Sequence, residues 1–223
     1  MPRFLIIAAA GSGTRLGGGQ PKALVPLCGR PMIAWTLQAF SPVAFSGVVI
    51  AAPPGRVEEF AALAGSGVRV VAGGDRRTDS VRCGFEALAA GDSDLVCVHD
   101  AARPFVTADE ASAVLDAAER VGAAVGATPV VDTIKRGAAG RVVSTIERDG
   151  LYAAATPQAF RAGILRRALA SAREATDEAA LCEALGVSVA IVPLSRLSFK
   201  ITTLEDLEIA QALLSRRLHE ERS

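Results

Sequence analysis

Residues 4–23, FLIIAAAGSGTRLGGGQPKA, decide the fold, because a short apolar run passes directly into a glycine-rich loop. The run at 4–9 is continuously apolar, which is typical of a strand covered on both faces. Glycines leave backbone N–H groups free to approach phosphate oxygens, and open α/β sheets bind ligands at the carboxyl ends of their strands. The stretch therefore predicts a buried first strand and a phosphate-binding loop with two cations, Arg15 and Lys22.

Further apolar runs alternate with amphipathic stretches along the chain. Strands are expected at 4–9, 48–52, 68–72, 95–99, 124–131 and 187–193, and helices at about 31–40, 56–65, 79–90, 107–121, 161–173, 177–185 and 203–219. This alternation predicts an α/β fold with a doubly wound, mostly parallel (mixed) sheet and helices on both faces. With 223 residues the chain can bury one large core, so we expect a single domain over residues 1–223.

The segment at about 132–156 interrupts the alternation. It reads as a two-stranded hairpin around Gly137–Gly140. An isolated hairpin is only marginally stable in water, so we expect this β-arm to pack on another surface, such as a second subunit. The following Thr156-Pro157-Gln158 is interpreted as a turn before the next helix.

Hydroxyl side chains mark three expected helix starts. Thr107 and Thr203 each precede acidic residues of a first turn, which is a typical N-cap pattern. Thr176 is expected to cap the helix at 177–185.

The composition excludes several classes of protein. Lys and Arg total 24, as do Asp and Glu, so no global positive field recruits nucleic acid or an anionic membrane. No apolar run approaches the roughly 20 residues that a bilayer requires, and the short run at 4–9 fits a strand better than a signal peptide. The four cysteines lie far apart without zinc spacing, which favours a reduced, cytoplasmic setting.

The glycine-rich loop does not match two common nucleotide-binding motifs. Gly11-x-Gly13 is followed by Leu16 where a dinucleotide-binding loop has its third glycine, and Pro21 interrupts the helix that should begin there. Lys22 is followed by Ala23, so the loop is not a Walker A motif either. A turn with incidental charges remains the alternative.

The second informative stretch is VHDAARP at 98–104, at the end of an apolar strand. Asp100 there can hold Mg²⁺, which binds through one or two carboxylates together with substrate phosphates. Alternatively, Asp100 caps a turn and Arg103 pairs with it. His99 is interpreted as structural, since no Ser/His/Asp set supports a covalent nucleophile.

Seven motifs, taken in order, are similar to those of the 2-C-methyl-D-erythritol 4-phosphate cytidylyltransferases. They are AAGSGTRL with PK at 9–22, GGDRRTDSV at 73–81, HDAARP at 99–104, DTIK at 132–135, TPQ at 156–158, TDEA at 176–179, and FKIT with EDL at 199–207. They cover about residues 4–210, nearly the whole chain. The chain departs from the family at Leu204, where a proline is common.

The resemblance implies a Rossmann-like nucleotidyltransferase fold and a role for each matching residue. Arg15, Lys22 and Lys200 would surround the triphosphate of CTP as catalytic cations, Asp100 would hold Mg²⁺, and Arg103 would support the Asp100 loop. The nucleotide would be bound by Ala9, Ala10, Gly11, Gly74, Asp75, Ser80 and Ala101, and the acceptor by Asp132, Thr133, Arg148 and Thr156. Without the resemblance, Asp75, Arg76 and Arg77 read equally well as a solvated loop.

The resemblance also implies a reaction and an assembly. CMP would pass from CTP to 2-C-methyl-D-erythritol 4-phosphate in isoprenoid precursor biosynthesis, releasing pyrophosphate, and the β-arm would complete the site of the partner in a homodimer. Ribitol 5-phosphate is an alternative acceptor. A nicotinamide-dependent oxidoreductase and a nucleotide-binding module without turnover are alternatives of other classes.

The basic residues themselves favour a local anion site. Only three of the 24 are lysines, and two of them, Lys22 and Lys200, fall in the motifs expected to bind the triphosphate. A compact ammonium suits a crowded phosphate. The third, Lys135, is assigned no chemistry.

Overall fold

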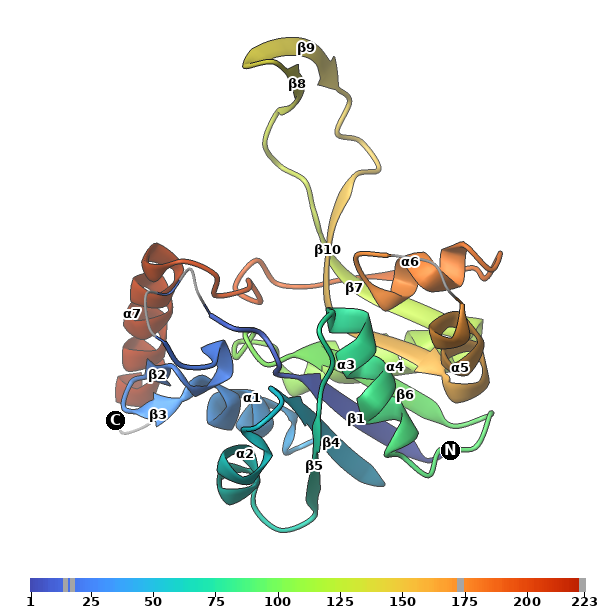
Figure 1. Cartoon of the computed structure of the whole chain (residues 1–223). Helices are drawn as coiled ribbons and strands as arrows, with labels where there is room; N and C mark the ends of the chain where they lie inside the picture. The colour runs from blue at the N-terminus through green and yellow to red at the C-terminus, as the bar shows by residue number, and fades with distance from the viewer. Residues whose placement is uncertain (14–15, 17–18, 172–174, 221–223) are drawn as a thin grey trace.

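The computed structural model describes residues 1–13, 16, 19–171 and 175–220. Its centre is a seven-stranded sheet with the strand order β11-β7-β10-β6-β1-β4-β5 (Figure 1). The strands are β1 (Arg3–Ala8), β4 (Gly47–Ala52), β5 (Val68–Ala72), β6 (Leu95–Asp100), β7 (Ala123–Pro129), β10 (Tyr152–Arg161) and β11 (Ala190–Pro193). Strand β10 pairs antiparallel with β6 and β7, whereas the other neighbouring pairs are parallel. The predicted mixed, doubly wound sheet is confirmed.

Helices cover both faces of the sheet. On one face lie α1 (Met32–Phe40), α2 (Val57–Ala64) and α4 (Ala108–Val121), and on the other lie α3 (Arg77–Glu86), α5 (Ala162–Ala170) and α6 (Glu178–Glu183). Side chains alternate along a strand, so Leu5 and Ile7 of β1 pack with the first set and Phe4 and Ile6 with the second. The continuous apolar run at 4–9 reflects this burial on both faces.

A third apolar cluster holds the C-terminal helix α7 (Leu204–Glu220) beside the small hairpin of β2 (Pro26–Leu27) and β3 (Arg30–Pro31) (Figure 1). Ile201, just before α7, is fully buried in this cluster. The helix begins at Leu204 without the proline of the family pattern, because Thr203 and Asp206 exchange hydrogen bonds between side chain and backbone. This packing fixes the segment that carries Lys200.

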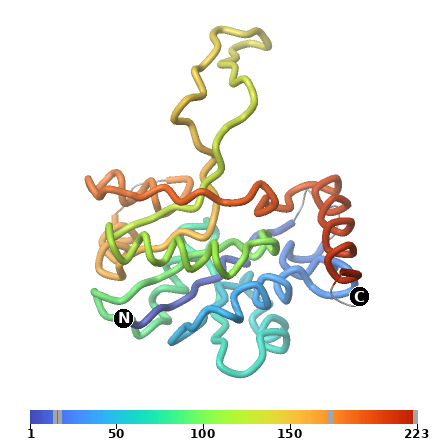
Figure 2. The backbone as a smooth tube through the Cα atoms, turned by 180° about the vertical axis from the view of Figure 1, so that it is seen from behind, coloured from blue at the N-terminus to red at the C-terminus, as the bar shows by residue number. Residues whose placement is uncertain are grey.

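The expected β-arm is present and stands away from the body of the molecule (Figures 1 and 2). It consists of β8 (Ile134–Ala138) and β9 (Arg141–Ile146), joined by Ala139 and Gly140, which have φ angles of 46° and 73°. Two positive φ angles are typical of a two-residue hairpin turn, and glycine accepts them readily. Lys135 donates a hydrogen bond to Thr145 across the hairpin at 2.7 Å.

The structure corrects three expectations about local structure. Thr156-Pro157-Gln158 is not a turn but part of β10, at a register shift between Ala154 and Gln158. Helix α6 is capped by the Asp177 carboxylate, not by the Thr176 hydroxyl. Arg77 is not in a solvated loop but is the first residue of α3, with its side chain 24% exposed.

No helix within the described part of the chain is both long and apolar enough to span a bilayer.

The predicted N-cap of α4 yields a test of the fold. Thr107 Oγ1 accepts the Glu110 N–H at 3.1 Å, and Glu110 returns the bond by accepting the Thr107 N–H at 2.9 Å. We expect Thr107→Ala to lower the free energy of unfolding by about 1 kcal/mol, because one N–H of the first turn loses its acceptor. Thr107→Ser keeps an acceptor and should match the parent within about 0.5 kcal/mol in urea unfolding; an equal loss in both variants would contradict the capping role.

Candidate active site

A cavity of about 170 Å³ opens at the carboxyl ends of β1 and β6. Its wall includes all seven residues expected to bind the nucleotide, together with Lys22, Asp100 and Lys200; the seven are Ala9, Ala10, Gly11, Gly74, Asp75, Ser80 and Ala101. Four segments far apart in the sequence therefore meet at one edge of the sheet. Arg15, the remaining expected triphosphate contact, lies outside the described residues.

The glycine-rich loop closes back on its own start. The Gly11 carbonyl accepts the backbone N–H of Lys22 at 3.1 Å. Gly13 has a φ of 69°, and a Cβ there would lie 2.9 Å from the Lys22 nitrogen, so only glycine allows this close approach. The short 3₁₀ helix η2 (Lys22–Leu24) follows and buries Ala23 and Leu24, which anchors Lys22 at the cavity wall.

A second glycine-containing segment, at Gly74, forms another part of the cavity wall. The Ser80 hydroxyl is 2% exposed and lies 3.2 Å from both the N–H and the carbonyl oxygen of Gly74. A Cβ on Gly74 would lie 2.5 Å from Asp79 Cβ, which explains the glycine at this position. Ser80 thus fixes the backbone of the turn, and Gly74 and Asp75 present it to the cavity.

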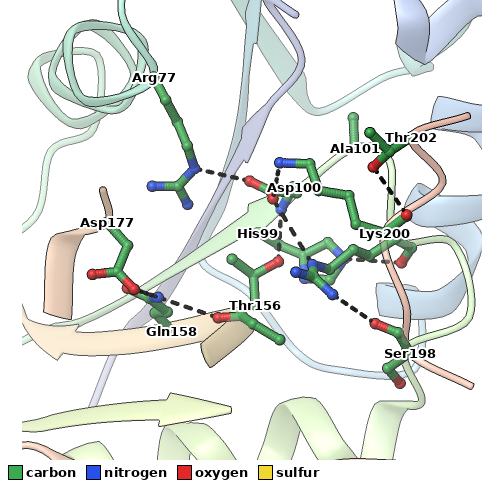
Figure 3. Close-up of polar contacts among 12 residues, drawn as sticks. Arg77, His99, Asp100, Ala101, Thr156, Gln158, Asp177, Ser198, Lys200 and Thr202 are labelled. Atoms are coloured by element: carbon green, nitrogen blue, oxygen red, sulfur yellow. Dashed lines mark hydrogen bonds and ion pairs between the residues drawn. The ribbon is translucent and has the colours of Figure 1, made fainter. Parts of the chain in front are cut away.

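Asp100 is the electrostatic centre of the site (Figure 3). One carboxylate oxygen accepts Arg77 Nε at 3.0 Å, and the other lies 2.8 Å from Lys200 Nζ and 3.8 Å from Arg103 Nε. Burial alone would raise the pKa of Asp100, but the charges and hydrogen bonds of Arg77 and Lys200 outweigh it and hold the pKa well below its ordinary value. Asp100 is therefore ionised at neutral pH.

Arg77 links Asp100 to a second buried carboxylate. Arg77 Nη1 lies 2.6 Å from Glu178 of α6, a residue with no exposed surface. Burial raises the pKa of Glu178, and the Arg77 charge opposes that shift. Sequence reasoning missed both residues, because it interpreted Arg77 as solvated and TDEA as a helix cap. The signal that could have identified Arg77 and Glu178 was their place in the ordered motifs GGDRRTDSV and TDEA.

His99 has the structural role expected of it. The side chain is fully buried, with Nε2 3.1 Å from the Arg103 carbonyl oxygen and its ring 4.8 Å from that of Phe40. Burial lowers the pKa of His99 to about 4, so the ring is neutral at pH 7.

A second cavity lies against the same cluster. It is lined in part by Arg77, Asp100 and Lys200, which also line the first cavity, and by Arg103, Thr156 and Gln158. The Thr156 hydroxyl accepts the Asp100 N–H at 3.0 Å (Figure 3). The two cavities therefore share one charged wall.

The other expected acceptor contacts lie elsewhere in this chain. Asp132, Thr133 and Arg148 are exposed on the β-arm, where Thr133 and Arg148 line a separate hollow and Arg148 donates a hydrogen bond to the Val131 carbonyl. The structure thus brings Thr156 to Asp100 but leaves the arm residues away from the shared wall.

The carboxylates at the cavity bear on the expected Mg²⁺. Among the described residues, no group of three or more His, Cys, Asp or Glu side chains could hold a metal ion. Asp100 offers an ionised carboxylate on the cavity wall, which Asp75 also lines. One carboxylate combined with substrate phosphates is a usual environment for Mg²⁺, so these residues fit a metal that arrives with the nucleotide.

Comparison with known proteins identifies the family. Residues 4–216 match the family model described as IspD, 2-C-methyl-D-erythritol 4-phosphate cytidylyltransferase. A protein of that name from Frankia casuarinae is 47% identical over 220 residues, covering 95% of this chain and 80% of the relative. Another, from Acidobacterium capsulatum, is 41% identical and covers 96% and 98%.

The fold agrees with that result. The crystal structure of 2-C-methyl-D-erythritol 4-phosphate cytidylyltransferase from Thermus thermophilus superposes with a TM-score of 0.81 at 37% identity, covering 96% of this chain and 98% of that one. The ordered motifs, the two cavities with one charged wall and the comparisons lead to one conclusion: the chain belongs to the 2-C-methyl-D-erythritol 4-phosphate cytidylyltransferase family.

Proposed function

We propose that this chain transfers CMP from CTP to 2-C-methyl-D-erythritol 4-phosphate, giving CDP-2-C-methyl-D-erythritol and pyrophosphate. The observation that carries the proposal is the charged wall of Asp100, Arg77 and Lys200, which is shared by two cavities. We assign CTP to the cavity lined by the glycine turns and the acceptor to the one lined by Thr156. The two reacting phosphates then meet at the shared wall beside Lys200, with Lys22 on the CTP side.

The chemistry follows from charge. An oxygen of the acceptor phosphate bonds to the α-phosphorus of CTP, and the bond from that phosphorus to the oxygen bridging the β-phosphate breaks, so pyrophosphate leaves. The attacking oxygen is already ionised and needs no general base. Two anions must approach each other, so Lys22 and Lys200 neutralise them and stabilise the five-coordinate transition state. Arg15 is proposed for the same task.

We assign the divalent cation, Mg²⁺, to Asp100. When bound there with substrate phosphates, it supplies further positive charge to the transition state. Asp100 already contacts Lys200, so the same carboxylate orients that lysine toward the reacting phosphates. Arg103 supports this arrangement by donating to the Ser198 carbonyl at 2.9 Å, two residues before Lys200.

We also propose a homodimer in which the β-arm of one chain completes the acceptor site of the other. Val142 and Val143 on the arm are 66% and 61% exposed, and an isolated hairpin is marginal in water. Asp132, Thr133 and Arg148 would then reach a partner's Thr156 cavity. We further propose a cytoplasmic location, supported by four free thiols.

The acceptor is tested by competition. With CTP and Mg²⁺, we expect 2-C-methyl-D-erythritol 4-phosphate to release pyrophosphate and to be consumed in preference to equimolar ribitol 5-phosphate, with the products separated by chromatography. The family match favours the first acceptor. Preference for ribitol 5-phosphate would reverse the assignment, and CTP binding without release from either would identify a binding module. Omitting Mg²⁺ should abolish release.

Lys22 is tested by separating turnover from binding. We expect Lys22→Ala to lower kcat about a hundredfold, as for loss of one transition-state donor, and to change CTP affinity, measured by calorimetry, far less. Lys22→Arg keeps the charge and should retain more turnover than Lys22→Ala. A Lys22→Ala enzyme with unchanged kcat would exclude this role.

The shared site is tested by mixing two variants whose activity is low but measurable. Arg148→Ala and Lys200→Ala each damage every site of their own homodimer. If the arm acts on the partner, reassorted heterodimers carry one intact site, and the mixture should recover about a quarter of parental activity. As the control, each variant is taken through the same subunit exchange alone. No recovery of activity in verified heterodimers would mean that the arm acts on the site of its own chain.

A further inference from the structure

Lys200 lies on a segment that is held by hydrogen bonds on both sides of it along the chain. Residues 195–201 lie in the connection between β11 and α7 and belong to no helix or strand. After Lys200, the Ile201 N–H donates to the Ala102 carbonyl at 2.9 Å and Ile201 is buried. Before Lys200, a different residue holds the segment.

That residue is Glu110, in the first turn of α4. One carboxylate oxygen accepts the backbone N–H of Ser195 at 2.6 Å, and the other accepts the Ser198 hydroxyl at 2.9 Å. The second oxygen also accepts the Thr107 N–H at 2.9 Å. A helix cap of this kind needs only the last of these bonds, so the two others are additional to the capping of α4.

The two additional bonds continue to the charged wall. Ser198, labelled in Figure 3, is 3% exposed. Its carbonyl oxygen accepts Arg103 Nη1 at 2.9 Å. Two residues further on, Lys200 Nζ lies 2.8 Å from Asp100. Glu110 and Arg103 therefore hold Ser198 at its side chain and its backbone, and Ala102 holds Ile201, so that Lys200 is carried between two fixed points.

We infer that Glu110 is a positioning residue for Lys200: it orients the Lys200 segment for phosphate transfer without contacting either substrate. The inference rests on the proposed function, in which Lys200 acts on the phosphates. A displacement of about 1 Å at a reacting group can cost up to a hundredfold in rate. The carboxylate is specifically suited, because it accepts bonds on both oxygens, whereas an amide has one acceptor atom.

The test compares variants that affect the cap and the segment separately. Glu110→Ala removes the capping bond to Thr107 and also the bonds to Ser195 and Ser198. Thr107→Ala weakens only the cap and leaves the bonds to Ser195 and Ser198. We expect Glu110→Ala to lower kcat about tenfold, Glu110→Gln to lie between it and the parent, and Thr107→Ala to keep parental kcat. In a Lys200→Ala background, Glu110→Ala should cause no further loss, because it acts through that lysine.

Hydrogen exchange of the substrate-free protein gives a readout without activity. The amides of residues 195–201 should exchange faster in Glu110→Ala but not in Thr107→Ala. Unchanged exchange in Glu110→Ala, or equal kcat in Glu110→Ala and Thr107→Ala, would overturn the inference. So would an additive loss with Lys200→Ala. A parental protein that binds CTP but never releases pyrophosphate would instead overturn the proposed function, and the role of Glu110 with it.

Discussion

The site depends on one buried negative charge. Asp100 ends the central strand β6 and is contacted by Arg77, Lys200 and Arg103, which come from three different segments. A carboxylate in a buried position is costly unless it is paired, and three cations confined to a small volume repel one another without it. Asp100 therefore draws α3, the segment after β11 and the loop after β6 to one point. Arg77, Asp100 and Lys200 line both cavities.

Much of the fold and part of the candidate site could be predicted from local sequence. Continuous apolar runs identified the parallel strands, and Gly137 and Gly140 marked the hairpin of the β-arm, although only Gly140 lies in its turn. The lysine count also proved informative, since Lys22 and Lys200 line the cavity while Lys135 bonds to Thr145 within the arm. A chain of zero formal charge thus places two of its three lysines at one cavity.

Two of the features that were missed depend on long-range pairing, and a third is a local ambiguity. Strand β10 is rich in alanine and contains Pro157, and proline normally argues against a central strand. It is tolerated here at the register shift beside β7. The Arg77–Glu178 pair joins residues 101 positions apart, and no local pattern shows that α3 and α6 bring them together. The cap of α6 was misplaced by one residue, since Thr176 and Asp177 can both serve as caps.

The continuity of β10 limits how the length of this protein can change during evolution. The strand leaves the base of the arm at Tyr152 and reaches the Asp100 amide at Thr156. A residue gained or lost at the Ala139-Gly140 tip alters only the turn, and the rest of the chain keeps its register. A residue gained between Tyr152 and Thr156 turns the neighbouring side chains of β10 to the opposite face of the sheet, because side chains alternate along a strand. Natural length variation should therefore be found at the tip of the arm and not at its base.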